Sequence, residues 1–214
     1  MHDPGDAFPV DGLPLGSILV SAPAMTGKYE LLLQFIAEGG RHGDGGLFVT
    51  TNESARSVLS EIEETAGGTL PLLRMVDCVS EQQSIEGQFP EERVEYVNSP
   101  GDVTGVGIGI SEQLRRFSED GTEHTRIAFH PLSTLLLYSD VETVFRFLHV
   151  LRGRIDEVGA IGLFTIDPTT HKEETVNTVK QVFDGAIEIR DAEAGREMRI
   201  VGLPNTPEGW ISLE

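Results

Sequence analysis

The 214-residue chain has one cysteine, few lysines and no long hydrophobic segment. Because Cys78 is the only cysteine, no intrachain disulfide can form, which indicates a reducing compartment. No apolar run approaches the roughly 18 residues that a membrane-spanning helix needs. The first residues, MHDPGDAFPVDG, contain neither a basic nor an apolar segment, so no signal peptide is expected. We therefore expect a cytoplasmic protein without a membrane partner.

Positive charge is scarce as well. The chain has 16 basic and 35 acidic residues, a net charge of −19, and the acids are spread along its whole length. Such an acidic, lysine-poor composition resembles halophilic proteins, whose self-repulsion is screened by concentrated counterions. A surface that binds nucleic-acid phosphates needs clustered lysine and arginine, and Arg115-Arg116 is the one dense pair here. The composition therefore predicts a halophilic protein and argues against nucleic acid as a direct partner.

Helices and buried strands alternate along most of the chain. We expect an N-terminal arm over residues 1–16, which are rich in proline, glycine and aspartate, and a single domain over 17–214. Apolar runs predict strands at 17–22, 47–50, 72–77, 126–130 and 160–166, with a short strand at 94–97. Helical periodicity follows most of them, so the fold class is α/β with a mostly parallel, helix-flanked central sheet.

The end of the chain has a different pattern. Residues 186–190 and 198–201 nearly alternate around a turn, which predicts a C-terminal antiparallel β-hairpin, with 209–213 as a candidate third strand. Capping boxes are expected at Ser139 with Glu142, opening a helix over about 140–158, and at Thr170 with Glu173. The glycine-spaced run over 101–109 is interpreted as a flexible turn that leads into a helix at about 111–119, and 79–92 as a surface excursion.

The stretch SILVSAPAMTGK, residues 17–28, has the layout of a phosphate-binding loop. A buried strand, a tight turn ending in Gly-Lys and an apolar helix start follow one another, as in the consensus G-x-x-x-x-G-K-[ST]. Gly27 and Lys28 match, whereas Ala22 replaces the first glycine and Tyr29 replaces the metal-binding Ser or Thr. The pattern predicts an anion or nucleotide site formed by Ala24, Met25, Thr26, Gly27, Lys28 and Tyr29. A purely structural turn between strand and helix is the alternative.

The order of these segments resembles the KaiC branch of the RecA-like ATPases over about residues 12–210. ILVSAPAMTGK is similar to that family's Walker A segment, GLFVTTNES to its second strand, RIAFHPLSTLL to its Walker B strand, and VFDGAIEIR with GREMRIVGLPNTP to its C-terminal hairpin. The chain also resembles short haloarchaeal KaiC-like proteins that lack a second ATPase domain. The resemblance implies a RecA-like P-loop NTPase fold, with ATP and Mg²⁺ as the ligands of an intact site.

Carried over residue by residue, this resemblance implies a degenerate site. Lys28 would face the β- and γ-phosphates, but Tyr29 cannot supply a hydroxyl to Mg²⁺. His130 stands where the Walker B aspartate belongs, and a histidine is not a hard oxygen ligand. At the two acidic positions after the second strand the chain has Asn52 and Glu53. Glu53 is the remaining candidate catalytic residue, because it could polarise a water, while Asn52 is equally a good helix N-cap.

Other polar residues at the expected carboxyl edge of the sheet carry weaker hypotheses. Asp167 and His171 together with His130 could suggest a metal cluster, but their spacing follows no ligand signature and we expect none. Ser133 and Ser139 lack a nucleophile elbow, which argues against a hydrolase triad.

The sequence thus predicts a regulatory or scaffolding protein with a KaiC/RecA-like core, weak or absent ATP binding and poor ATP hydrolysis. It would act on a protein partner or associate with itself, in the way the family forms rings. One alternative is a working KaiC-like ATPase in signalling or recombination-type processes, whose non-standard metal shell uses Glu53 or Asp167. A DNA-associated RecA-like module is a third possibility, which the charge of −19 opposes.

Overall fold

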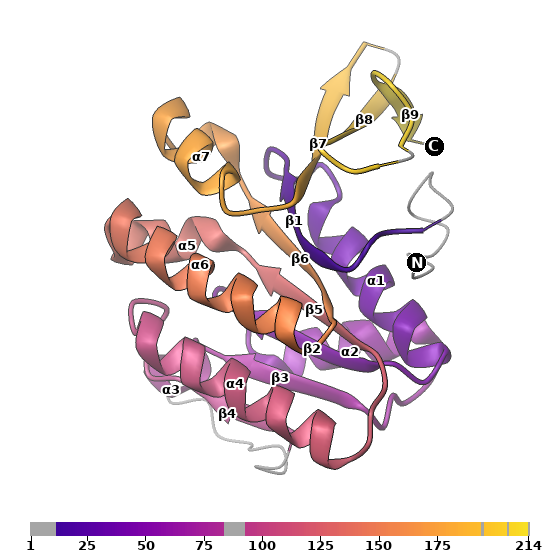
Figure 1. Ribbon diagram of the computed structural model, residues 1–214, viewed down its shortest axis with the longest axis vertical. Coiled ribbons are helices and arrows are strands. Elements are labelled where there is room, and N and C mark those ends of the chain that lie inside the picture. Colours follow the sequence, from indigo (N-terminus) through magenta and orange to yellow (C-terminus); the bar gives the residue numbers. More distant parts are fainter. Residues whose placement is uncertain (1–11, 84–92, 194, 205, 214) are drawn as a thin grey trace.

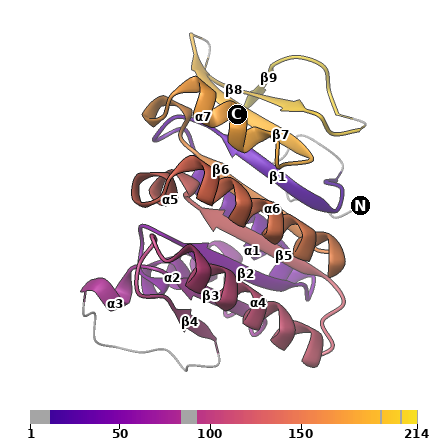
Figure 2. The ribbon, with the colours of Figure 1, turned by 60° about the vertical axis from the view of Figure 1, so that its left-hand side comes forward.

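The computed structural model describes residues 12–83, 93–193, 195–204 and 206–213 (Figure 1). Nine strands of these residues form one sheet in the order β4-β3-β2-β5-β6-β1-β7-β8-β9 (Figure 2). Their bounds are β1 Gly16–Ser21, β2 Gly45–Thr50, β3 Leu73–Asp77, β4 Val94–Tyr96, β5 Thr125–His130, β6 Ile161–Ile166, β7 Gly185–Ala192, β8 Gly195–Val201 and β9 Ile211–Leu213.

The sheet is parallel from β4 to β7 and antiparallel from β7 to β9. The predicted α/β class, with a mostly parallel central sheet and a C-terminal antiparallel hairpin, is therefore confirmed. In β1, β2, β5 and β6 every residue is buried, which explains why these strands are continuous apolar runs rather than alternating ones. Because the central strands are parallel, their carboxyl ends lie at one edge of the sheet, where ligands of open α/β folds bind.

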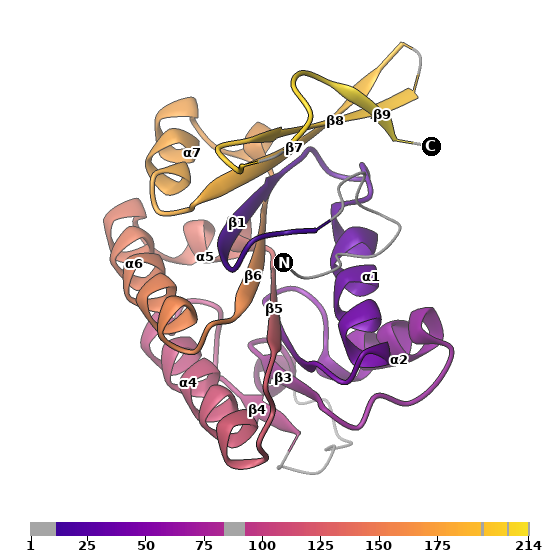
Figure 3. The same ribbon diagram turned by 45° about the vertical axis from the view of Figure 1, so that its right-hand side comes forward.

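Helices cover both faces of the sheet (Figure 3). On one face, α1 Lys28–Arg41 and α2 Ala55–Ala66 pack in a core that includes Phe35, Ile62 and Phe48. On the other face lie α4 Val103–Glu119, α5 Leu132–Tyr138, α6 Val141–Glu157 and α7 Glu173–Lys180. The short α3, Ser80–Gln83, and a 3₁₀ turn η1, Pro168–Thr170, complete the described elements. Within the described ranges, no helix has both the length and the apolar character needed to span a bilayer.

The prediction of a flexible turn at 101–109 is wrong, because α4 begins at Val103 and contains Gly105, Gly107 and Gly109. Asp102 caps this helix by accepting a hydrogen bond from the backbone N–H of Gly105 at 2.8 Å. A Cβ on Gly109 would lie 3.3 Å from a methyl carbon of Val76 on β3. Gly109, which looks like a turn residue in the sequence, therefore lets the helix approach the sheet closely.

Several helix ends differ from the predicted ones. Asp140, not Ser139, caps α6, by accepting a hydrogen bond from the N–H of Thr143 at 2.9 Å. Thr170 belongs to η1 and not to a capping box, and Lys172 is the residue before α7. Ser54, not Asn52, caps α2. The helix α5 was not predicted from the sequence.

The first helix, α1, contains Gly39 and Gly40 and ends at Arg41. Gly39 is needed there because the Arg126 side chain crosses it, and a Cβ would lie 2.4 Å from the Arg126 Nε. Arg126 is buried and paired with Asp44 at 2.8 Å. Of the expected N-terminal arm, residues 1–11 lie outside the described residues, Leu13 is fully buried and Gly16 already belongs to β1. Of the expected surface excursion, 84–92 lie outside them as well.

Candidate functional site

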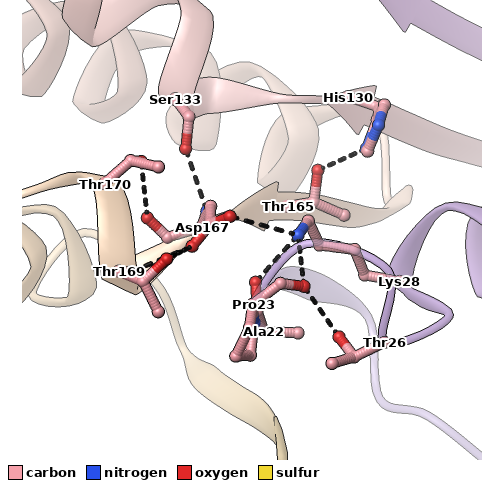
Figure 4. A network of polar contacts seen from close by, with 10 residues as sticks. All are labelled: Ala22, Pro23, Thr26, Lys28, His130, Ser133, Thr165, Asp167, Thr169 and Thr170. Atoms are coloured by element: carbon pink, nitrogen blue, oxygen red, sulfur yellow. Dashed lines mark hydrogen bonds and ion pairs between the residues drawn. The ribbon is translucent and has the colours of Figure 1, made fainter.

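The loop between β1 and α1 lies at the carboxyl edge of the sheet, next to the ends of β5 and β6 (Figure 4). Gly27 precedes the first helical residue with φ of 87°, a left-handed conformation that glycine adopts without strain. Met25 has φ of 62° and a fully exposed side chain, so it does not fill the loop. Thr26 is buried, and its hydroxyl donates to the carbonyl of Pro23 at 2.8 Å. The loop is therefore a compact turn in its own right.

The Lys28 ammonium points back into this loop. Its Nζ donates to the carbonyl oxygens of Ala22 at 2.8 Å and Pro23 at 2.7 Å, and it lies 3.9 Å from a carboxylate oxygen of Asp167. Burial lowers the pKa of Lys28, and the neighbouring charges of Asp167 and Glu30 partly oppose this shift. The Lys28 side chain thus lies inside the turn, with Asp167 as its acidic neighbour.

Asp167 follows the last residue of β6 and is held rigidly. Its Oδ1 accepts hydrogen bonds from the backbone N–H of Thr169 at 2.9 Å and the Thr169 hydroxyl at 2.6 Å, while its own N–H donates to Ser133 Oγ at 2.9 Å. Burial alone would raise the pKa of Asp167, but the bonds from Thr169, the Lys28 charge and the backbone N–H of Ala24 lower it overall. Asp167 is therefore a carboxylate at neutral pH, beside the lysine and the loop.

The rings of Tyr29 and His130 contact each other beside the loop. Their ring centroids are 4.9 Å apart, and the tyrosine ring also packs edge-on against Phe48 at 6.3 Å. The Tyr29 hydroxyl oxygen is buried without a hydrogen bond of good geometry. Burial raises the pKa of Tyr29, and the nearby Glu61 carboxylate raises it further. The phenol therefore stays protonated and turned into the protein.

The imidazole of His130 is a buried, neutral group. Its Nδ1 lies 2.7 Å from the hydroxyl of Thr165 on β6. Burial, helped by the Lys28 charge, lowers the pKa of His130 to about 3. Mg²⁺ prefers hard oxygen ligands in near-octahedral geometry, and neither a protonated phenol nor this imidazole supplies one. The residues at the two metal-binding positions thus do not fit the ion that the fold family implies.

A cavity of about 370 Å³ opens at this edge of the sheet. Its lining includes the loop residues Ala24, Met25 and Gly27 together with the three charged or aromatic groups Lys28, Tyr29 and Asp167. Asn52, His130 and Ser133, which the sequence analysis also considered, line the cavity as well. Most of the predicted site residues thus meet in one place, at a hollow large enough for a phosphate-bearing ligand.

Glu53 is not brought into that group. It lies in the turn after β2, where its backbone N–H donates to Thr50 Oγ1 at 3.2 Å and its carbonyl accepts a hydrogen bond from the Thr50 hydroxyl at 2.7 Å. Glu53 does not line the cavity. His171 lines no part of the cavity either, and its Nε2 is buried without a partner. No group of three or more metal-ligating side chains occurs in the described part of the chain.

Sequence reasoning missed one contact of the loop. Arg196, at the start of β8, donates to the carbonyl of Thr26 at 3.2 Å, and its guanidinium lies where a Cβ on Gly27 would be. It joins the C-terminal hairpin to the phosphate-loop turn across 170 residues. No local motif could have indicated this contact, because it depends on the pairing of β7 with both β1 and β8.

Comparison with known proteins agrees with the geometry at the level of the fold. Residues 16–189 match a family of unknown function, DUF7504. The KaiC-like protein PH0186 from the hyperthermophilic archaeon Pyrococcus horikoshii OT3 has a similar structure, with a TM-score of 0.63 and 17% identity over 94% of this chain and 85% of that one. At this identity the likeness establishes a KaiC-like, RecA-type fold. No curated protein sequence matches the chain.

Proposed function

The chain belongs to the DUF7504 family of unknown function, and we propose that it is a regulatory or scaffolding protein with a degenerate nucleotide site on a KaiC-like core. In this proposal the loop at 22–28 binds a phosphate-type anion, and ATP hydrolysis is poor or absent. Cytoplasmic location and adaptation to high salt are parts of the same proposal, supported by the single cysteine and the net charge of −19.

The contact between Tyr29 and His130 is the observation that carries this proposal. Catalysis of phosphoryl transfer depends almost entirely on positioning and charge neutralisation, in which the metal ion has the central part. Here the two metal-binding positions hold a buried phenol and a neutral imidazole whose rings are 4.9 Å apart. A ligand for Mg²⁺ is thus lost at both positions, and the two rings pack against each other at the cavity.

The phosphate side of the site is better preserved. Gly27 has the left-handed conformation that the turn requires, and Lys28 stays inside the loop with its ammonium on two loop carbonyls. A helix N-terminus with a nearby lysine favours an anion through backbone N–H groups and charge. These features support binding without turnover, the combination expected of a protein that senses or carries a ligand. Its partner would be another protein or a further copy of the chain.

Purified full-length protein in molar KCl tests the proposal through its rate of ATP turnover with Mg²⁺. We expect wild type and the Lys28→Ala variant to show the same rate, within the background of a buffer control. Lys28→Ala is the appropriate control because it removes the lysine on which any P-loop ATPase activity of this site would depend. A wild-type rate above that of Lys28→Ala would mean that the protein is an ATPase, and the proposal would be wrong.

The second candidate is an ATP-binding KaiC-like ATPase with a non-standard metal shell. It is favoured by Asp167, whose carboxylate oxygen lies 3.9 Å from the Lys28 ammonium and is a hard ligand of the type Mg²⁺ prefers. Calorimetric titration of ATP with and without Mg²⁺ separates the candidates. Micromolar binding that requires Mg²⁺ supports the second, whereas binding that is independent of Mg²⁺ supports the first.

A further inference from the structure

The Lys28 ammonium lies against oxygen atoms of three other residues of the chain. Two of its three N–H bonds point to the carbonyls of Ala22 and Pro23, and the remaining side faces Asp167 (Figure 4). The Lys28 and Asp167 side chains are only 10% and 11% exposed, so water screens this ion pair little. An anion that binds at the lysine therefore shares it with the Asp167 carboxylate or displaces that carboxylate.

The position of Asp167 is fixed independently of Lys28. Thr169 holds one carboxylate oxygen through two hydrogen bonds, while Ser133 on α5 holds the backbone N–H of the same residue. The other carboxylate oxygen, Oδ2, is the one turned to the lysine at 3.9 Å. The carboxylate is thus presented to the loop by a scaffold formed from β6, η1 and α5, and it does not rely on the ion pair for its place.

We propose that the Asp167 carboxylate is an internal occupant of the anion site, which an incoming anion must displace or outcompete. This inference rests on the proposed function, because it assumes that the loop binds an anion at all. Asp167 then acts as a specificity residue. A monovalent anion such as chloride gains little by replacing a carboxylate of equal charge, whereas pyrophosphate or the triphosphate of a nucleotide gains from its larger charge.

Such an occupant would suit a protein whose surroundings are rich in simple anions. Lys28 and Asp167 both line the cavity of about 370 Å³ beside the loop, so small anions have access to them. Without a ligand, the Asp167 carboxylate balances the charge of the Lys28 ammonium. When a ligand binds, a multiply charged anion takes the place of this single negative charge. The class of ligand that follows from this exchange is a polyphosphate group, free or as part of a nucleotide.

Calorimetric titration of inorganic pyrophosphate into the full-length protein, in molar KCl with EDTA, tests this inference. Asp167→Asn and Asp167→Ser both remove the charge, and both retain a side chain that can cap η1, so the local turn is preserved. We expect each variant to bind pyrophosphate at least about ten-fold more tightly than wild type. Asp140→Asn is the matched control, because it removes one negative charge from another capping residue, at the start of α6, and should leave the affinity unchanged.

The outcomes separate this inference from the proposed function. If wild type binds and the Asp167 variants bind equally or more weakly, Asp167 is not a competitor, although the anion site itself stands. If wild type and both Asp167 variants all fail to bind, the inference and the proposed function fail together. Repeating the titration with Mg²⁺ shows whether Asp167 is a metal ligand rather than a competitor. If Asp167 binds the metal ion, Asp167→Asn should bind pyrophosphate more weakly than wild type when Mg²⁺ is present. That result would also overturn the inference.

Discussion

His130 links the candidate site to the stability of the fold in acid. The unfolded chain takes up a proton at this imidazole near pH 6.5, whereas burial and the Lys28 charge lower the pKa of the folded state to about 3. As the pH falls, the unfolded state is therefore protonated first, and stability is lost between pH 6.5 and about 3. The free energy of unfolding should fall by up to about 1.4 kcal/mol per pH unit from this group alone.

Urea unfolding of wild type and His130→Gln between pH 6 and pH 4 measures this contribution. The glutamine keeps a polar partner for Thr165 but does not titrate, so the variant should lose about 2 kcal/mol less than wild type over this range. His149→Gln, an exposed change on α6, should follow wild type. Parallel curves for wild type and His130→Gln would show that the imidazole is already charged in the folded state.

The limits of sequence reasoning at the residue scale are visible around Tyr29. Gly27 and Lys28 could be assigned from the motif, because their roles follow from backbone conformation and charge. The direction of the Tyr29 ring could not, because it is set by Phe48 on β2 and His130 on β5, which lie far away in the sequence. The pairing of Lys28 with Asp167 likewise depends on β1 and β6 being neighbours. Motifs identify the residues, and sheet order decides what they contact.

At the scale of elements, substitutions at two glycines of α4 distinguish the effect of helix propensity on stability from the effect of packing. A Cβ on Gly107 would lie 3.5 Å from the nearest ring carbon of Phe147, an ordinary contact, whereas one on Gly109 would lie 3.1 Å from the Glu95 Cγ. We expect Gly107→Ala to stabilise the fold by about 0.5 to 1 kcal/mol, because alanine loses less backbone entropy in a helix. Gly109→Ala should be about 1 kcal/mol or more less stable than Gly107→Ala, since its neighbours must move.

The free energy of unfolding in urea, measured for both variants against wild type, checks this difference. Equal effects of the two substitutions would mean that α4 does not approach β3 as closely as the contact between Gly109 and Val76 indicates. The pair is informative because both glycines lie in the same helix two residues apart, so differences in helix propensity cancel.

The same helix explains why the elements were only partly predictable. Strands β1, β2, β5 and β6 were recognised because burial on both faces produces continuous apolar runs. The first half of α4 was not, because glycine is a poor helix former and its use for close packing leaves no local signal. The start of α6 was missed by one residue, since Ser139 and Asp140 are both good caps and only the structure shows which accepts from Thr143.

At the scale of the whole molecule, ion pairs offset only part of the negative charge. The buried pair of Arg126 and Asp44 joins α1, β5 and the loop before β2, with side chains that are 3% and 9% exposed. Most other ion pairs among the described residues lie at the surface, where each contributes little. With 35 acidic and 16 basic residues, surface pairing cannot neutralise the chain. The folded state therefore carries unrelieved repulsion, which the expanded unfolded chain experiences less strongly.

This repulsion predicts that salt stabilises the fold. The Debye length falls from about 10 Å at 0.1 M to about 3 Å at 1 M, so concentrated KCl screens surface repulsion but hardly affects the buried Arg126–Asp44 pair. We expect the Tm to rise by roughly 10 °C between about 0.1 M and about 2 M KCl, which corresponds to about 3 kcal/mol for a chain of this size.

Two controls assign the effect to charge. Sucrose at equal osmolality favours compact states without screening, so it should reproduce only part of the rise. Replacing the exposed Glu64, Glu157 and Glu174 by glutamine, on α2, α6 and α7, changes the net charge from −19 to −16 and should raise the Tm at low salt while flattening its dependence on KCl. A Tm that is independent of KCl, or a triple variant with an unchanged slope, would show that repulsion among the acids does not limit the stability of this protein.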